Sequence, residues 1–281
     1  GTVTTGACLS VISQTKADNM FQITPSASAA KVIANDNCFQ VCFTDPNQGT
    51  ASADYIASKG LAKKVGVIYN SSDAYSSGVY DNFKAEAAAK GLDLVASEAF
   101  TGDSKQDFSS QLSKIKASGA ELIFLPIYYQ EASLILSQAK TAGITAKFFG
   151  CDGLDGLLNI ENFDKSLAEN VMLLTPFAAN ATDETTKKFV AAYNAKFDPS
   201  TLNQFAADAY DAVYIVKAAA EKAGVTGDMS VSDICNALKG AMTEISVDGV
   251  TGSGMTWKAT GEVNKEPKAV KIENGEYQPM D

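Results

Sequence analysis

The 281-residue sequence contains no histidine and no arginine, so all 23 of its basic residues are lysine. Without histidine the chain cannot build a Ser-His-Asp or Cys-His catalytic site, a histidine metal site, or a proton shuttle near neutral pH. Without arginine it lacks the planar group that usually grips carboxylates and phosphates. An anionic ligand would therefore have to bind hydroxyls, backbone N–H groups, helix N-termini or lysine.

The sequence also has a shortage of positive charge. Its 33 acidic and 23 basic residues give a net charge of −10, which disfavours nucleic acid and anionic lipid as partners. The hydrophobic share of 46% is typical of a globular protein, and no apolar run is long enough to suggest a membrane span. The length is comfortable for two domains.

The cysteines do not form a recognisable framework. Their number is odd, their spacing is scattered and no CxxC is present, which argues against both a disulfide scaffold and a zinc site. We expect them to be small buried hydrophobic residues, although a bond from Cys8 to Cys38 or Cys42 stays open. The five positions are Cys8, Cys38, Cys42, Cys151 and Cys235.

Strand-like runs alternate with helical patterns along the whole chain, which predicts an α/β fold with parallel sheets flanked by helices. The longest helix is expected at 205–223, with Ala209, Val213, Val216 and Ala220 as its buried stripe. An Asn-Gly pair at 274–275 predicts a terminal hairpin. Strands are expected at 21–23, 39–43, 65–69, 92–95, 122–126, 147–150 and 171–174, and further helices at 81–90 and 129–142.

The start of the sequence is unusual for such a fold. Gly1 to Val3 resemble the end of a strand, and a helical pattern follows at once. No signal peptide precedes them. We therefore expect the first strand–helix units of the fold to be missing from this sequence.

Polar residues follow several predicted strands, where parallel α/β sheets bind their ligands. Thr5 and a segment from Ser26 to Ser28 offer hydroxyls and N–H groups that suit a carboxylate. Asp152, with Tyr128 and Tyr75 after other strands, suits an ammonium group. A ligand with both groups is an α-amino acid.

Each of these residues also has a plainer interpretation. Thr5 and Ser28 could only cap helices, as serine and threonine often do. Tyr75 could pack within its own loop, and Tyr128 could belong to the core. Asp152 could cap the short turn before Leu154.

Five segments in order carry a resemblance to a known family. They are GTVTTGACLSV, ITPSASA, VGVIYNSSDAYSSGVYDNFK, IYYQEASLILSQAKTAGI and FFGCDG, followed by a DAYDAVYIV helix and the hairpin. Together they resemble the leucine/isoleucine/valine-binding proteins of the type I periplasmic binding fold. The resemblance implies two Rossmann-like parallel-sheet lobes joined by three crossovers, with the first lobe truncated at its N-terminus. Lobe one would hold 1–46 and 177–254, and lobe two 47–176 and 255–281.

The same resemblance implies roles for individual residues in a cleft between the lobes. Thr5 and Ser28 would donate hydroxyls to the ligand carboxylate, and backbone groups near Ser26 would add to them. Tyr75 would cover the ligand from the opposite lobe, while Tyr128 and Asp152 would receive the ammonium. Val3 and Thr4 would border the side-chain pocket. No metal and no cofactor is implied.

The implied function is that of the substrate-binding protein of an ABC importer. It would bind a small, neutral, aliphatic amino acid by hinge closure and deliver it to a membrane permease. Its location would be periplasmic or extracellular, with a lipid anchor as one option. One alternative is a ligand-sensing domain of a receptor or regulator for amino acids, amides or small aromatic acids. Another is an α/β enzyme, which the missing histidine, arginine and phosphate loop disfavour.

Overall fold

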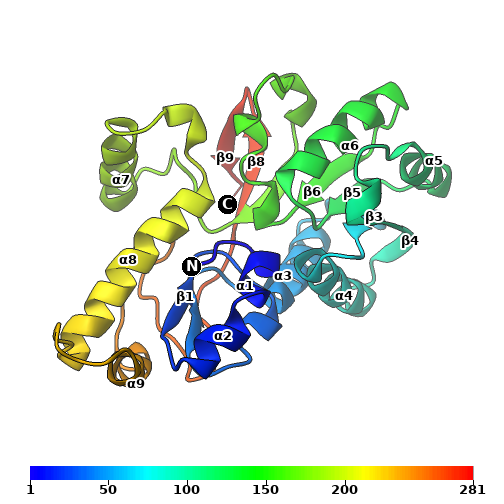
Figure 1. Ribbon diagram of the computed structural model, residues 1–281. Coiled ribbons are helices and arrows are strands. Elements are labelled where there is room, and N and C mark those ends of the chain that lie inside the picture. Colours follow the sequence, from blue (N-terminus) through cyan, green and yellow to red (C-terminus); the bar gives the residue numbers. More distant parts are fainter. Residues whose placement is uncertain (281) are drawn as a thin grey trace.

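The computed structural model describes residues 1–280 and has two lobes in which strands and helices alternate (Figure 1). Within these residues no helix is both long and apolar enough to cross a membrane. The larger lobe contains a seven-stranded sheet and the smaller lobe a two-stranded one. The two-lobed α/β fold predicted from the sequence is confirmed.

The larger sheet has the strand order β4-β3-β5-β6-β7-β8-β9. Its first five strands are parallel, and β8 and β9 add an antiparallel hairpin at the far edge. Asn274 and Gly275 both have positive φ in the hairpin turn, as an Asn-Gly turn of this kind requires. The strands are β3 (Lys64–Asn70), β4 (Asp93–Phe100), β5 (Leu122–Leu125), β6 (Lys147–Gly150), β7 (Met172–Thr175), β8 (Lys268–Glu273) and β9 (Glu276–Pro279).

Helices cover both faces of this sheet because alternate strand residues point to opposite sides. Val67 and Phe124 pack with α3 (Asp45–Ser58) and α4 (Ala74–Ala89). Ile68 and Ile123 pack on the other side with α5 (Ser109–Ser118) and α6 (Tyr129–Thr141). The core therefore holds the ends of β3, β5 and β6 in fixed positions, from which the loops toward the smaller lobe begin.

The smaller lobe is built on two parallel strands, β1 (Gln22–Thr24) and β2 (Cys38–Gln40). Helix α8 contacts β1, beside which Figure 1 draws it in yellow. The amino group of Gly1 donates to the Ile23 carbonyl at 2.7 Å, so the first residues run next to β1 without forming a strand. The helices of this part are α1 (Thr5–Leu9), α2 (Ile12–Ala17), α7 (Glu184–Asn194), α8 (Gln204–Ala223) and α9 (Val231–Met242).

The chain passes between the two sheets three times. The first passage follows β2 and enters α3, and the second follows β7. Before the third, Trp257 and Val263 still pack in the core of the smaller lobe, and the Trp257 indole N–H donates to the Gln40 carbonyl at 2.8 Å. The third passage therefore lies between Val263 and β8.

The predicted strands all occur, although the bounds of most differ by a few residues, and the strand expected at 39–43 is shorter, Cys38–Gln40. The predicted hairpin is confirmed. The helix expected at 81–90 is longer, because Asp73 caps α4 at its true start. The buried stripe predicted for the longest helix is wrong at Val213, which is 68% exposed, whereas Val216 and Ala220 pack half-buried against the core. The fully buried face of α8 holds both polar and apolar residues: Gln204, Ala207, Asp208, Asp211, Ala212, Ile215 and Ala219.

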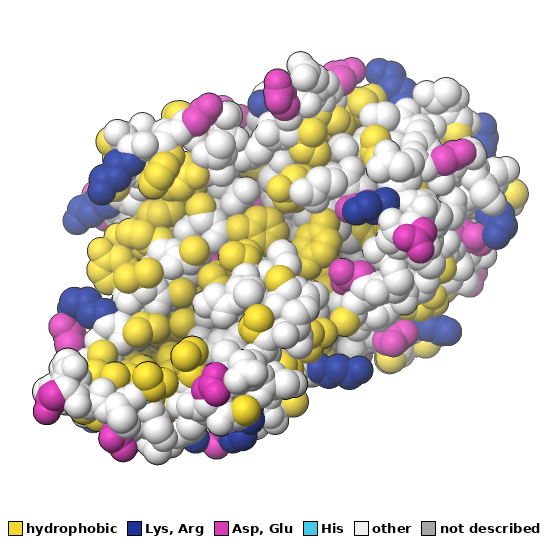
Figure 2. Space-filling view, in the orientation of Figure 1, with side chains coloured by type: hydrophobic (Ala, Val, Ile, Leu, Met, Phe, Trp, Pro, Cys, Tyr) yellow, Lys and Arg dark blue, Asp and Glu magenta, His cyan; other side chains and the backbone are white. Residues whose placement is uncertain are grey.

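Exposed hydrophobic side chains gather on one part of the surface. Figure 2 shows them over the left half of the view, where Figure 1 draws α7 and α8. All of the large ones fall within residues 1–46 or 177–254, and the larger sheet's own helices contribute none. They are Val3, Met20, Phe197, Tyr210, Val213, Tyr214 and Val231.

Candidate ligand-binding site

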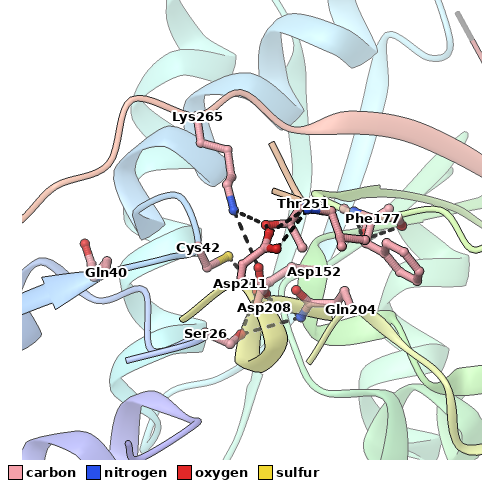
Figure 3. A network of polar contacts seen from close by, with 12 residues as sticks. Ser26, Gln40, Cys42, Asp152, Phe177, Gln204, Asp208, Asp211, Thr251 and Lys265 are labelled. Atoms are coloured by element: carbon pink, nitrogen blue, oxygen red, sulfur yellow. Dashed lines mark hydrogen bonds and ion pairs between the residues drawn. The ribbon is translucent and has the colours of Figure 1, made fainter. Parts of the chain in front are cut away.

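The carboxylate of Asp152 lies between the two lobes and is 2% exposed. It lies two residues after the end of β6, at the start of a short 3-10 turn, Asp152–Leu154. The Tyr75 hydroxyl donates to its Oδ1 at 2.7 Å. Longer contacts reach its Oδ2 from the smaller lobe: Ser26 Oγ at 3.4 Å, and Cys42 Sγ and Gln204 Nε2 at 3.5 Å (Figure 3).

Asp152 is the first residue of this turn, and its carboxylate has a hydrogen bond to the Gly153 backbone within the turn. Its contacts with Tyr75 and with the smaller lobe go beyond a capping role. Burial raises the pKa of the Asp152 carboxyl, and the hydrogen bond from Tyr75 opposes that rise. A positively charged group that displaced the weak contacts at Oδ2 would favour the ionised carboxylate.

Two tyrosines stand next to Asp152. Tyr75 lies in the first turn of α4, where the Asp73 carboxylate accepts its backbone N–H at 2.8 Å. Its ring stacks on Tyr128 with 4.9 Å between centroids, and Tyr128 is the residue before α6. The Tyr75 hydroxyl also accepts the Gly153 N–H at 3.1 Å. Both tyrosines therefore belong to the same polar site, and Tyr75 is not packed within its own loop.

Thr5 and Ser28 face this site from the smaller lobe. The Thr5 hydroxyl oxygen accepts the N–H groups of Ser28 and Ala29 at 3.3 and 3.4 Å, so it joins α1 to the loop after β1. The Ser28 hydroxyl is buried beside the Asp45 carboxyl. Burial raises the pKa of Tyr128, and a hydrogen bond to the Thr5 backbone opposes that rise, which places Thr5 next to Tyr128 across the cleft.

A cavity of about 610 Å³ opens between the lobes beside Tyr128. Val3 and Thr4 line it from the smaller lobe, together with Asn203 and Phe205. Lys105 and Glu131 form an ion pair at its rim, with 3.4 Å between Nζ and Oε1. Its size is in the range of small-molecule sites.

Buried acidic groups continue from Asp152 into the smaller lobe. Asp208 lies one turn beyond Gln204 on α8, and its carboxylate is 3.5 Å from the Lys265 ammonium (Figure 3). Burial raises the pKa of Asp208 to about 8, and Lys265 opposes this. Lys265 also donates to the Thr251 hydroxyl at 2.6 Å and is the one lysine of residues 1–280 that is buried.

The buried carboxyls outnumber this single buried cation. Burial raises the pKa of Asp155 to about 7 and that of Asp45 well above its ordinary value. Asp211 is stabilised by three hydrogen bonds, from the N–H groups of Val250 and Thr251 and from the Thr251 hydroxyl. The interior between the lobes thus favours a cationic group.

The structure brings all eight sequence-predicted residues to this region, and adds others that the sequence did not indicate. Gln204, Cys42 and Gln48 contact Asp152, and Asn203, Phe205 and Lys105 line the cavity. Cys42 lies two residues after the end of β2, so the rule that found Asp152 could have found it too. Gln204 follows a loop and Lys105 follows a 3-10 turn, so a search for polar residues after predicted strands could not find them. The individual contacts with a ligand remain predictions for six residues: Thr5, Ser26, Ser28, Tyr75, Tyr128 and Asp152.

The sequence model described as "Periplasmic binding protein" matches residues 1–276. The chain belongs to the periplasmic binding protein family. The chain is 32% identical over 231 residues to "Leu/Ile/Val-binding protein homolog 3" of Brucella melitensis, covering 81% of this chain and 61% of that protein. It is 28% identical to the "Leucine-, isoleucine-, valine-, threonine-, and alanine-binding protein" of Pseudomonas aeruginosa, covering 78% and 58%.

Solved structures of this periplasmic binding protein family show the same fold. The leucine-binding protein LivK of Thermotoga maritima superimposes with a TM-score of 0.88 at 25% identity, covering 100% of this chain and 78% of LivK. LivJ of Streptococcus pneumoniae, in complex with isoleucine, gives 0.84 at 27% identity, covering 99% and 76%. The resemblance to the leucine/isoleucine/valine-binding proteins is confirmed. The chain spans about three-fifths of the length of the two curated relatives.

Proposed function

We propose that this periplasmic binding protein captures a neutral aliphatic α-amino acid between its lobes, for delivery to the membrane permease of an ABC importer. The observation that carries the proposal is the buried Asp152 carboxylate, which contacts Tyr75 of one lobe and Ser26 and Gln204 of the other. The names of the relatives support the choice of aliphatic amino acids. Such a protein works outside the cytoplasm, in the periplasm or at the cell surface, where a lipid anchor is one option.

In this proposal the ligand is held by its two poles. The ammonium replaces the long contacts at Asp152 Oδ2 and packs against the rings of Tyr75 and Tyr128. The carboxylate accepts the hydroxyls of Thr5 and Ser28 and N–H groups near Ser26. No arginine is needed in this arrangement, because neutral hydroxyl and N–H groups that already lie close together donate the hydrogen bonds to the carboxylate.

The ligand side chain would enter the cavity next to these polar groups. Val3, Thr4 and Phe205 give this space an apolar wall, and Asn203 closes one side. The transfer of an aliphatic side chain from water into this cavity is favourable. A charged side chain would lose its hydration on entering the cavity, next to the Lys105–Glu131 pair, and this loss is unfavourable. Specificity would thus depend on hydrophobic contacts more than on hydrogen bonds.

Binding would be coupled to lobe closure, without covalent chemistry. The ligand contacts come from both lobes, so only the closed form can make them all, and the ligand shifts the population toward it. The lobe boundaries at 46/47 and 176/177 are kept in this proposal. The packing of Trp257 and Val263 favours a last boundary after Val263, later than the 254/255 expected from the sequence.

The proposal is tested by thermal unfolding with a panel of amino acids. Leucine, isoleucine or valine at a hundred times its Kd should stabilise the protein by ~2.7 kcal/mol, seen as a rise in Tm of several degrees. 4-Methylpentanoate and 3-methylbutylamine, which are leucine without its ammonium or without its carboxylate, should each give a much smaller rise. Benzoate serves as a probe of a site for aromatic acids.

Asp152→Asn separates a binding role from a structural one. It keeps the size of the side chain but removes the charge, so we expect the rise in Tm with leucine to disappear. Asp198→Asn, at an exposed capping residue of the smaller lobe, is the matched control and should retain the rise. An unchanged response in Asp152→Asn, or no response of the wild type to any neutral amino acid, would contradict the proposal.

A further inference from the structure

Cys8 and Cys38 meet inside the smaller lobe. Cys8 lies in α1 and Cys38 begins β2, and their exposed fractions are 0% and 1%. Both belong to one small hydrophobic cluster with Ala27, Ala29 and Val32, separate from the main core of the lobe. In this structure both are free thiols.

Gln22 shows how closely the two cysteines approach. It is the register partner of Cys38 across the parallel β1–β2 pair, where strands lie about 4.8 Å apart. Its side-chain Nε2 donates to Cys8 Sγ at 3.2 Å. Cys8 therefore lies over the strand pair at the level of Cys38.

The two thiols also interact with each other. A hydrogen bond between them is the largest influence on both pKa values: it lowers the pKa of Cys8 to about 7 and raises that of Cys38. The two sulfurs therefore lie within hydrogen-bonding reach of each other in the folded lobe. Two thiols this close can be joined as a disulfide when an oxidant accepts their electrons.

The other three cysteines have different neighbours. Cys42 Sγ lies 3.5 Å from the Asp152 carboxylate, and Cys151 Sγ lies 3.6 Å from the Ser52 hydroxyl. Cys235 is buried on α9. Burial is the largest cause of the raised pKa of all three, so they stay protonated and unreactive at neutral pH.

We propose that Cys8 and Cys38 form a disulfide bond when the chain folds outside the cytoplasm, and that this bond fixes α1 against the smaller sheet. The location rests on the proposed function.

The oxidant is a disulfide, either that of an envelope thiol oxidase or oxidised glutathione. The Cys8 thiolate attacks it to form a mixed disulfide and release one thiol. The Cys38 thiolate then attacks the Cys8 sulfur and releases the second. The protein loses two protons and two electrons, and the oxidant becomes two thiols. Because both sulfurs are buried in the folded lobe, the exchange takes place during folding.

The bond would act on the ligand site through α1. This helix has five residues, too few for a helix to be stable alone, so its position depends on what it packs against. Thr5 lies one turn before Cys8, and its hydroxyl holds the N–H groups of Ser28 and Ala29. A covalent tie at Cys8 therefore keeps Thr5 in place while the lobes open and close.

The decisive experiment counts thiols in the full chain. The protein is folded with oxidised glutathione, quenched in acid, denatured and alkylated with N-ethylmaleimide. We expect three alkylated cysteines out of five, and all five after reduction. Digestion with trypsin and chymotrypsin separates Cys38 from Cys42 by cleavage after Phe39, so mass spectrometry can identify the cross-linked pair. Five alkylated cysteines without reduction, or a link from Cys8 to Cys42, would overturn the proposal.

Variants give a second readout. Cys8→Ser and Cys38→Ser should each leave four free thiols, and reduction should no longer change their Tm. The control Cys235→Ala should leave two free thiols and keep the wild-type response, a fall in Tm of roughly 5–10 °C on reduction. A wild-type Tm that is the same with and without reductant would count against the stabilising role of the bond. The thiol count does not involve any ligand, so a failure of the proposed amino acid binding would leave it unaffected.

Discussion

At the scale of single residues, the hydrogen bond from Tyr75, at 2.7 Å, is the shortest of the side-chain contacts made by Asp152. Tyr75→Phe removes a buried hydroxyl that donates to Asp152 and accepts from Gly153, leaving both groups short of a partner. We expect a loss of about 1–3 kcal/mol in the free energy of unfolding, measured by urea denaturation. Tyr80→Phe is the control, since Tyr80 lies in the same helix and packs its ring on Tyr69. Equal losses in the free energy of unfolding for Tyr75→Phe and Tyr80→Phe would contradict a specific stabilising role of the Tyr75 hydroxyl.

Some of these residues could be found from the sequence, for a physical reason. Asp152 lies two residues after the end of β6 and Tyr128 directly precedes α6, and loops at such strand ends meet at one edge of a parallel sheet. Gln204 could not be found in this way. Its contact with Asp152 exists only because the two lobes come together, and no local pattern encodes that approach.

At the scale of elements, α8 shows where hydrophobic periodicity misleads. The predicted stripe included Val213, which is exposed, while the buried face combines apolar residues such as Ile215 with Gln204, Asp208 and Asp211. Polar side chains can occupy a buried face when partners satisfy them, as the loop at Val250 and Thr251 does for Asp211. A prediction that assigns only apolar residues to the interior misses the polar residues of such a face. The central strands β5 and β7 of the larger sheet were easier to predict, because both of their faces are buried and their residues are almost all apolar.

The ion pair between Lys265 and Asp208 joins α8 to the last passage between the lobes. At pH 9, above the Asp208 pKa of about 8, Lys265→Met leaves the ionised Asp208 buried without a counter-ion, so we expect a loss of about 3–5 kcal/mol in the free energy of unfolding at that pH. The double variant with Asp208→Asn removes both charges and should lose less than the single variant. Urea denaturation of the two proteins measures this difference. If the double variant were the less stable of the two, the buried charge of Asp208 would not be the cause.

At the scale of the whole molecule, buried carboxyl groups are concentrated at the junction of the lobes. Asp45, Asp152, Asp155 and Asp208 are buried there, and Lys265 is the buried cation that opposes them. Carboxyls in such a place keep their protons more tightly than they do in the unfolded chain. A ligand ammonium would favour the ionised form of Asp152, whereas a simple carboxylic acid would add to the repulsion. The charge distribution therefore agrees with an amino acid as ligand, and it also gives the fold a dependence on pH.

The sign of that dependence follows from Asp155 and Asp208, whose folded pKa values of about 7 and about 8 lie above the ordinary 3.8. Between pH 5 and 7 the unfolded chain has lost these two protons and the folded protein largely retains them. Each group should therefore lower the free energy of unfolding by about 1 kcal/mol per pH unit as the pH rises. Urea denaturation at pH 5, 6 and 7 measures the slope. Asp208→Asn cannot ionise and should reduce the slope by about half, because the contribution of Asp155 remains. Asp198→Asn, at a residue whose wild-type pKa is lowered and lies below this range, should leave the slope unchanged. A wild-type stability that rises over this interval would mean that the two carboxyls are ionised in the folded protein.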